Sequence, residues 1–208
     1  MIYSQVSQLS KFNPHLKRRI LGFAVFFCLL TQVVFALPQT AEQSAQQIYT
    51  SLIKYQNPSL DQAKNAVVTL KASFDFQIFF SRCARDIEAS LTPTEKNSIQ
   101  SAFEDLFFTN FEKKIKNIAA RRINKPSYQS EEKNNQIFKV SFKGQRPDGQ
   151  QSTFAVFLHQ ENNAWRLVDL EFDGALLSRQ YQGSFNKIFR EKGAIGLLQS
   201  IKNKATNL

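Results

Sequence analysis

Apolar residues recur at helical spacing through the first half of the chain. An apolar residue returns every three or four positions in residues 41–55, and again in residues 60–72 after the break at Pro58-Ser59. The same spacing continues from about 75 to 90, where most of the apolar residues are phenylalanines. We therefore predict three consecutive amphipathic helices in this part of the chain.

A fourth, longer helix is predicted to begin at Thr92-Pro93-Thr94-Glu95. Thr92 can cap the first turn, proline suits the first helical position, and Glu95 can bond back to the Thr92 amide. One apolar stripe then runs from Ile99 to Ile118. The helix should end before Lys125-Pro126, because the residue preceding a proline avoids helical dihedral angles.

Beyond residue 126 the apolar period changes to two. Alternation predicts strands at 138–142, 154–158 and 165–172, and less clearly an edge strand at 128–133. Short turns between these segments indicate an antiparallel meander, which needs helices to cover its apolar face. We expect an α+β domain, in which a helical N-terminal part packs on a curved antiparallel sheet of about four strands, closed by C-terminal helices.

The last predicted strand carries three apolar and three acidic residues at alternate positions. We expect Val168, Leu170 and Phe172 on the covered face of the sheet. Asp169 should then point away from that face and orient the turn into the next helix. With Glu171 and Asp173 it is expected to form a solvated strand face, because a calcium site needs about six to eight oxygens from a shaped loop.

Residues 1–36 have the layout of a secretory signal peptide. Basic residues precede an apolar run from 20 to 36, which ends in the small-x-small pattern Val34-Phe35-Ala36. We predict cleavage after Ala36, with an uncleaved membrane anchor as the alternative. The remainder, 37–208, should form one domain, in which residues 37–124 are mainly helical, 125–173 form the sheet and 174–204 form C-terminal helices.

Charge and composition exclude several classes of function. The chain has a net charge of +10, but a short basic cluster at 113–122 is more typical of a solvated helix end than of a nucleic-acid surface. His159 is the only histidine beyond residue 36 and is expected to be exposed at a strand end. Cys83 falls on an apolar helix face and is expected in the core. We find no zinc spacing and no phosphate loop in the sequence, so we expect no enzyme, no metal and no cofactor.

The C-terminal fifth resembles a known family. A tryptophan, an aliphatic residue and an aspartate lie on a strand, an acidic residue with glycine follows, and a leucine, a tyrosine, a phenylalanine and glycines come at set spacing. This pattern is similar to the C-terminal signature of the MlaC family, the periplasmic phospholipid carriers. The residues that carry it are Trp165, Val168, Asp169, Asp173, Gly174, Leu177, Tyr181, Phe185, Gly193, Gly196, Leu197 and Leu198.

The helical region resembles the same family more weakly, through Phe74-Asp75-Phe76, Ser81-Arg82 and Leu91 to Lys96. The chain departs from the family pattern in three places, with Ala84-Arg85-Asp86, Ala175-Leu176 and Gln182. The resemblance implies a cone-like fold, similar to that of cystatins and nuclear-transport-factor domains.

The resemblance also implies a lipid carrier whose aromatic residues line a pocket for acyl chains. Each buried methylene gains about 0.8 kcal/mol, so two chains of ~14 methylenes would gain on the order of 20 kcal/mol before entropic losses. The expected lipid-binding residues lie on the covered sheet face and on the helices opposite. They are Phe76, Phe80, Phe107, Phe111, Val140, Phe142, Phe154, Val156, Leu170, Phe172, Leu177, Tyr181 and Phe185.

The partners implied by the resemblance are a phospholipid, an inner-membrane ABC transporter complex and an outer-membrane lipoprotein–porin complex. The protein would be a periplasmic monomer that helps maintain outer-membrane lipid asymmetry, without binding nucleic acid. The sequence leaves two alternatives open. One is a secreted adaptor of the same fold with a filled core, and the other is a small isomerase or hydrolase that uses Tyr181, Asp169 or His159.

Overall fold

The computed structural model describes residues 40–54, 58–134 and 136–207, all of which lie in one compact unit. The predicted signal peptide and its cleavage site lie outside these residues. In the described part of the chain, no helix combines the length and the apolar character needed to cross a membrane.

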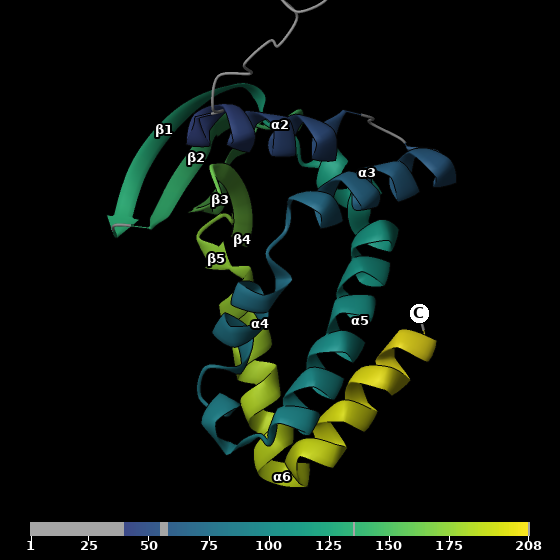
Figure 1. The fold of residues 1–208 in the computed structure, drawn as a ribbon. Helices are drawn as coiled ribbons and strands as arrows, with labels where there is room; N and C mark the ends of the chain where they lie inside the picture. The colour runs from purple at the N-terminus through teal and green to yellow at the C-terminus, as the bar shows by residue number, and fades with distance from the viewer. Residues whose placement is uncertain (1–39, 55–57, 135, 208) are drawn as a thin grey trace, which may run out of the picture. The chain divides into compact units, whose positions relative to one another are not determined.

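Four α-helices form the described part of the N-terminal half, as the apolar spacing predicted (Figure 1). Three of them begin with a capping box, in which a threonine or serine at the cap and a glutamine or glutamate three residues later exchange hydrogen bonds. The predicted start at Thr92 and Glu95 is one of these and is confirmed. The helices are α2 (Ala41–Ile53), α3 (Leu60–Ser73), α4 (Phe76–Ala84) and α5 (Pro93–Ala120).

Helix α4 is shorter than the predicted helix at 75–90. It ends at Ala84, and after a turn the short 3₁₀ helix η2 (Glu88–Ser90) follows. Asp86, in that turn, accepts hydrogen bonds from Gln182 and Asn186 of the C-terminal helix, at 2.7 and 2.6 Å. The turn is therefore tied to another element instead of continuing the helix.

The sheet is an open antiparallel meander in the order β1-β2-β3-β4-β5, which confirms the predicted fold class. It has five strands where about four were expected. The edge strand is real and longer than predicted, and a short fifth strand follows a tight turn. The strands are β1 (Asn124–Asn134), β2 (Ile137–Gln145), β3 (Gln151–Glu161), β4 (Ala164–Phe172) and β5 (Ala175–Leu176).

One expected side-chain direction in β4 is wrong. The strand pairs Leu170 with Val156 and Leu167 with Leu158, so the register shifts by one residue between these pairs. Val168 is the extra residue of this β-bulge and packs with Ala155 and Phe157 on the other face. Strict alternation placed it with Leu170, because a bulge leaves no obvious mark in a single sequence.

The C-terminal helix α6 (Leu177–Thr206) begins three residues later than predicted, because Asp173 and Gly174 form a turn with positive φ angles before β5. The predicted glycine break lies at Gly193, where φ is 65° and ψ is −169°. Glycine adopts this conformation without the steric penalty that a Cβ atom imposes. The second half of α6 thereby takes a new direction, as Figure 1 shows.

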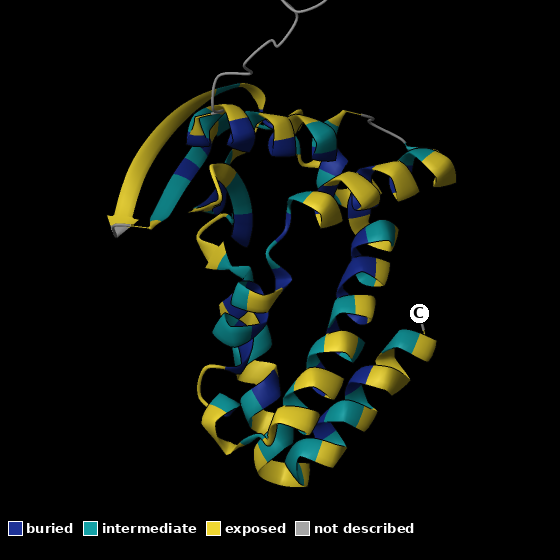
Figure 2. Cartoon of the chain, viewed as in Figure 1, coloured by how far each residue is buried: buried dark blue, intermediate teal, exposed yellow. Residues whose placement is uncertain are grey.

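Helices and sheet share one large core. Helix α2 packs on β2 and β3, α4 and α6 pack on β4, and α5 packs on α2, α3 and α6. Figure 2 shows the buried positions recurring along α5, whereas β1 is largely exposed. A second, small cluster on the opposite sheet face joins Phe157 and Val168 to Ile78 of α4.

Candidate functional site

A cavity of about 400 Å³ opens where the sheet meets the helices. Its wall comes from α2, from the C-terminal half of α5, from the start of β3, from the end of β4 and from the first turns of α6. The apolar part of the lining consists of Tyr49, Leu52, Ile53, Phe107, Phe111, Ile118, Ile123, Phe154, Phe172, Leu177 and Tyr181.

Six of the thirteen residues expected to bind lipid line this cavity. They are Phe107, Phe111, Phe154, Phe172, Leu177 and Tyr181. The other seven belong to the main core cluster, are buried and do not line the cavity. They are Phe76, Phe80, Val140, Phe142, Val156, Leu170 and Phe185.

Sequence reasoning missed the contribution of α2. Tyr49, Leu52 and Ile53 line the cavity, and α2 contacts both β2 and β3. The apolar spacing identified Leu52 and Ile53 as one face of a helix. It gave no sign that this face covers the sheet, because helix–sheet contacts between segments distant in sequence have no local signature.

Tyr49 connects the cavity wall to the chain between α5 and β1. The Ile123 amide donates to the Tyr49 hydroxyl at 2.8 Å, and the Tyr49 ring stacks on Phe142 with centroids 4.6 Å apart. Burial raises the pKa of Tyr49, although the Ile123 backbone and the nearby Arg122 oppose this shift. The hydroxyl is therefore neutral and serves as a fixed hydrogen-bond partner in an apolar wall.

Polar and basic residues surround the apolar part of the cavity. Lys114, Arg121 and Arg122 come from the end of α5 and the segment after it. The first two of these side chains are exposed and Arg122 is half-buried. The basic cluster predicted at 113–122 is indeed a solvated helix end, and part of it forms the rim of the cavity. Guanidinium and ammonium groups in this position suit an anionic group such as a phosphate.

Asp173 is the carboxylate of this lining. Partial burial would raise its pKa, but bonds from the Thr153 amide and the Ser152 hydroxyl, with the Arg146 and Arg121 charges nearby, hold the pKa below its usual range. The two hydrogen bonds measure 2.8 and 2.7 Å. The ionised carboxylate thus fixes the turn before α6 and leaves the rim net positive.

Tyr181 lines the cavity from α6. Burial, and secondarily the neighbouring Cys83, raise the pKa of Tyr181 to about 12. Cys83 is itself fully buried, and burial, with the Asp169 charge nearby, raises the pKa of its thiol. Cys83 is therefore the core residue that the sequence predicted, and Tyr181 remains protonated at neutral pH.

Asp169 is fully buried on the outer face of β4, which corrects the expectation of a solvated strand face. It accepts hydrogen bonds from the Ser178 amide at 3.1 Å and the Ser178 hydroxyl at 2.5 Å, and Arg82 lies 3.4 Å away. Burial raises the pKa of Asp169, although Ser178 and Arg82 oppose this shift. Its predicted role, pointing away from the covered face and orienting the chain into the last helix, is confirmed.

The cavity and the fold together define a class of protein. Apolar walls with a few polar groups at one side are typical of a site that binds a ligand. The chain belongs to the MlaC family, because the family model described as MlaC protein matches residues 40–203. The resemblance found in the sequence is thereby confirmed.

A solved structure supports the same fold. The phospholipid-binding protein from Ralstonia solanacearum, solved in complex with a phospholipid, is similar to this chain with a TM-score of 0.60. The alignment covers 80% of this chain and 94% of that protein at 14% sequence identity. A search of curated proteins finds no match.

Proposed function

We propose that this protein binds a phospholipid, with acyl tails in the cavity and the headgroup at the basic rim. The observation that carries this proposal is the apolar cavity of about 400 Å³ bordered by Lys114, Arg121 and Arg122. Its size falls within the range of roughly 300–1,000 Å³ that ligand sites occupy. Membership of the MlaC family and the phospholipid held by the Ralstonia solanacearum protein support it.

The energetics of tail burial favour a carrier that keeps its cargo. Each methylene removed from water contributes about 0.8 kcal/mol. A bound acyl chain therefore leaves the cavity slowly unless a partner changes the shape of the wall. Helix α2 and the first turns of α6 are the parts of the wall that such a partner would displace, because both lie over the sheet.

We further propose that the protein is a periplasmic monomer that carries lipid between the two membranes. Its partners would be an inner-membrane ABC transporter complex and an outer-membrane lipoprotein–porin complex, and the transport would maintain outer-membrane lipid asymmetry. Family membership supports these assignments. The predicted signal peptide supports export, and the intact mass of the exported protein tests it, since cleavage after Ala36 leaves a chain that begins at Leu37.

Native mass spectrometry of the exported protein, purified without detergent, tests lipid binding. We expect stoichiometric bound species that solvent extraction identifies as phospholipids. Ile118→Trp should fill part of the cavity and reduce the bound fraction several-fold. Ile195→Trp is the matched control, because Ile195 is 70% exposed on α6 and lies outside the cavity lining. Protein that is free of lipid and takes none from vesicles would instead favour the adaptor.

Lipid uptake from vesicles tests the headgroup assignment. The double variant Arg121→Gln and Arg122→Gln should take up phosphatidylglycerol several-fold more weakly than the wild type. Lys187→Gln with Lys204→Gln removes the same charge from exposed positions of α6 and serves as the control. Equal losses in both double variants would mean that net charge matters and that the rim makes no specific contact.

A further inference from the structure

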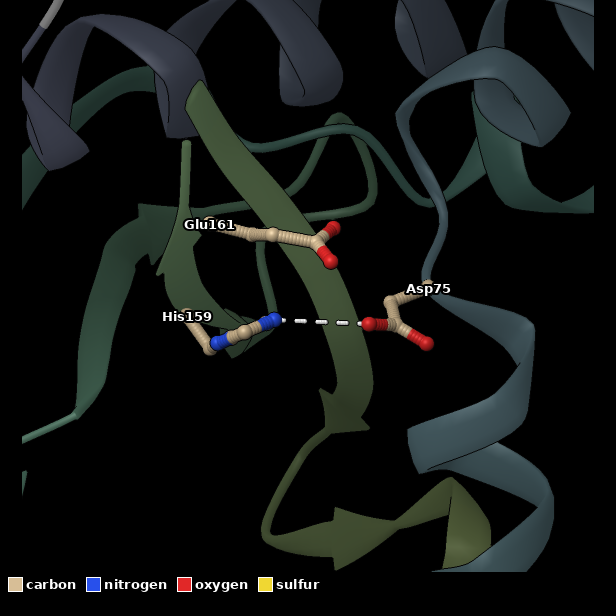
Figure 3. Close-up of side chains that lie close together, drawn as sticks. All are labelled: Asp75, His159 and Glu161. Atoms are coloured by element: carbon tan, nitrogen blue, oxygen red, sulfur yellow. Dashed lines mark ion pairs between the residues drawn. The ribbon is translucent and has the colours of Figure 1, made fainter. Parts of the chain in front are cut away.

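Three side chains that suit a metal ion gather at the end of β3 remote from the cavity. Asp75, His159 and Glu161 each offer one ligand atom, and these atoms all lie within 4.8 Å of one another (Figure 3). His159 and Glu161 are two residues apart on β3, so they project from the same sheet face. The cavity instead uses Ser152, Thr153 and Phe154 at the beginning of this strand.

His159 is half-buried, whereas the sequence predicted that it would be exposed at a strand end. It lies on the face of β3 that also carries Phe157, and the segment that leads into α4 packs against this end of the sheet. The Asp75 amide donates to the Leu167 carbonyl at 2.8 Å, and Phe74 forms a parallel bridge with Leu167. Asp75 is thereby held beside β3 and β4.

The imidazole nitrogen that faces Asp75 has no hydrogen-bond partner. His159 Nε2 is buried and lies 3.3 Å from Asp75 Oδ2, yet the two atoms are not aligned as a hydrogen bond. Two ligands that each lie 2.0–2.1 Å from a tetrahedral zinc ion are separated by about 3.4 Å. The observed spacing, without hydrogen-bond alignment, therefore fits two atoms that share an ion.

The two oxygens of the Asp75 carboxylate face different partners. Its Oδ1 accepts the Ile78 amide at 3.0 Å and caps α4, which leaves Oδ2 directed toward His159. Glu161 is exposed, and its carboxylate reaches toward the same space (Figure 3). Its flexible side chain can adjust its distance to an ion without moving the backbone.

We propose that Asp75, His159 and Glu161 form a binding site for a divalent ion of the zinc class. His159 Nε2, one oxygen of Asp75 and one of Glu161 would supply three ligands, and water the fourth. Two carboxylates balance the charge of a divalent ion. The imidazole favours zinc over calcium, which requires six to eight oxygens.

The neighbouring cation does not occupy this position. Arg166 lies opposite His159 in the β3–β4 pairing. Its guanidinium donates to the Ala72 carbonyl at 2.7 Å and the Phe74 carbonyl at 2.9 Å, and so closes the end of α3. A bound ion would add a second connection there, between β3 and the segment joining α3 to α4, without touching the cavity.

Zinc titration of the untagged, chelator-treated protein against a chromogenic zinc indicator tests the site. We expect one equivalent to bind, and cobalt to give the visible absorption of a tetrahedral complex. His159→Gln, Asp75→Asn and Glu161→Gln should each weaken zinc binding by about tenfold or more. Asparagine at position 75 retains the helix cap. Glu132→Gln, at an exposed position of β1, is the matched control and should bind as the wild type does.

Two results would overturn the site. The wild-type protein could take up no zinc, or the zinc it takes up could be unaffected by His159→Gln and Glu161→Gln, which would identify adventitious surface binding. Glu161 is exposed, so its substitution removes a ligand without disturbing the core, and circular dichroism verifies that each variant is folded. The test does not depend on lipid binding, and either property can fail without the other.

Discussion

The aromatic rings of the helices and those of the sheet behave differently although both belong to one core. The ring of Phe103 lies between 4.8 and 6.4 Å from rings that surround it on α4, α5 and α6. Phe172 has its ring 5.1 Å from Phe154 and otherwise faces the cavity. The rings of α4, α5 and α6 interdigitate, whereas Phe154 and Phe172 of the sheet have the cavity on one side.

This difference shows that a high content of phenylalanine does not by itself make a pocket. The same residue type fills space among α4, α5 and α6 and borders space at the sheet. Phe107 belongs to both regions, because it packs on Phe103 and Phe79 and also lines the cavity. The position of the backbone decides which of the two roles a ring plays.

Truncating one ring in each region should give the largest difference in the free energy of unfolding. Phe103→Ala leaves a void in a fully packed cluster and should lower the free energy of unfolding by about 3–5 kcal/mol. Phe172→Ala widens an existing cavity and should cost only about 1 kcal/mol. Denaturant titration measures both values, and equal losses would mean that the two regions do not differ in packing.

On the outer face of the sheet, buried hydrogen bonds of Asp169 contribute to stability, in contrast to the ring packing of the two aromatic regions. Asp169→Ala removes the acceptor for the buried Ser178 amide and hydroxyl. We expect a loss of about 2–3 kcal/mol in the free energy of unfolding, because buried donors are left unsatisfied. Asp169→Asn retains a carbonyl acceptor and should lose less. If both variants lost the same amount, the negative charge beside Arg82 would be the essential feature.

On the cavity side, the contribution of the Tyr49 hydroxyl to stability can be measured separately from that of its ring. Tyr49→Phe keeps the ring that stacks on Phe142 but leaves the buried Ile123 amide without its partner. The free energy of unfolding should fall by about 1–2 kcal/mol, while the apolar lining of the cavity is unchanged. Thermal unfolding and lipid content measured on the same preparation separate these two effects. A loss of lipid without a loss of stability would contradict the role of the Tyr49 hydroxyl as a hydrogen-bond partner that stabilises the fold.

The smallest effect on the free energy of unfolding is expected at Glu88, which lies after α4. Lys96 and Ser81 donate to Glu88, and the bond from Lys96 is the main reason that the pKa of Glu88 lies below its usual range. A carboxylate with a lowered folded-state pKa stabilises the protein above its unfolded pKa, and this contribution is lost as the pH falls through the folded value. Glu88→Gln should therefore cost about 0.5 kcal/mol at pH 7.

The pH dependence distinguishes this ion pair from a simple hydrogen bond. The difference between wild type and Glu88→Gln should shrink as the pH is lowered below about 4.5. Denaturant midpoints measured at pH 7 and pH 3 test it. A difference that is the same at both pH values would show that the charge of Glu88 contributes nothing.

Local patterns in the sequence predicted most of the fold, whereas the cavity depended on contacts between distant segments. The capping box at Thr92, the period of two beyond residue 126 and the glycine break at Gly193 are all local signals. The lining by Tyr49 and the basic rim at Arg121 and Arg122 arise only when α2 and the end of α5 meet the sheet. The pattern of apolar residues predicts which residues are buried, but it does not predict which of them line the cavity.

The bulge at Val168 has a consequence for insertions and deletions in this strand. Residues 165–167 and 169–172 follow two alternating patterns that are out of phase by one position. Deleting Val168 would join the two patterns into one regular alternation and leave Trp165, which packs edge-on against Phe138 at 5.0 Å, on its present face. Val168 is therefore a position at which β4 should accept both substitution and deletion, whereas a deletion at Arg166 would turn Trp165 to the opposite face of the sheet.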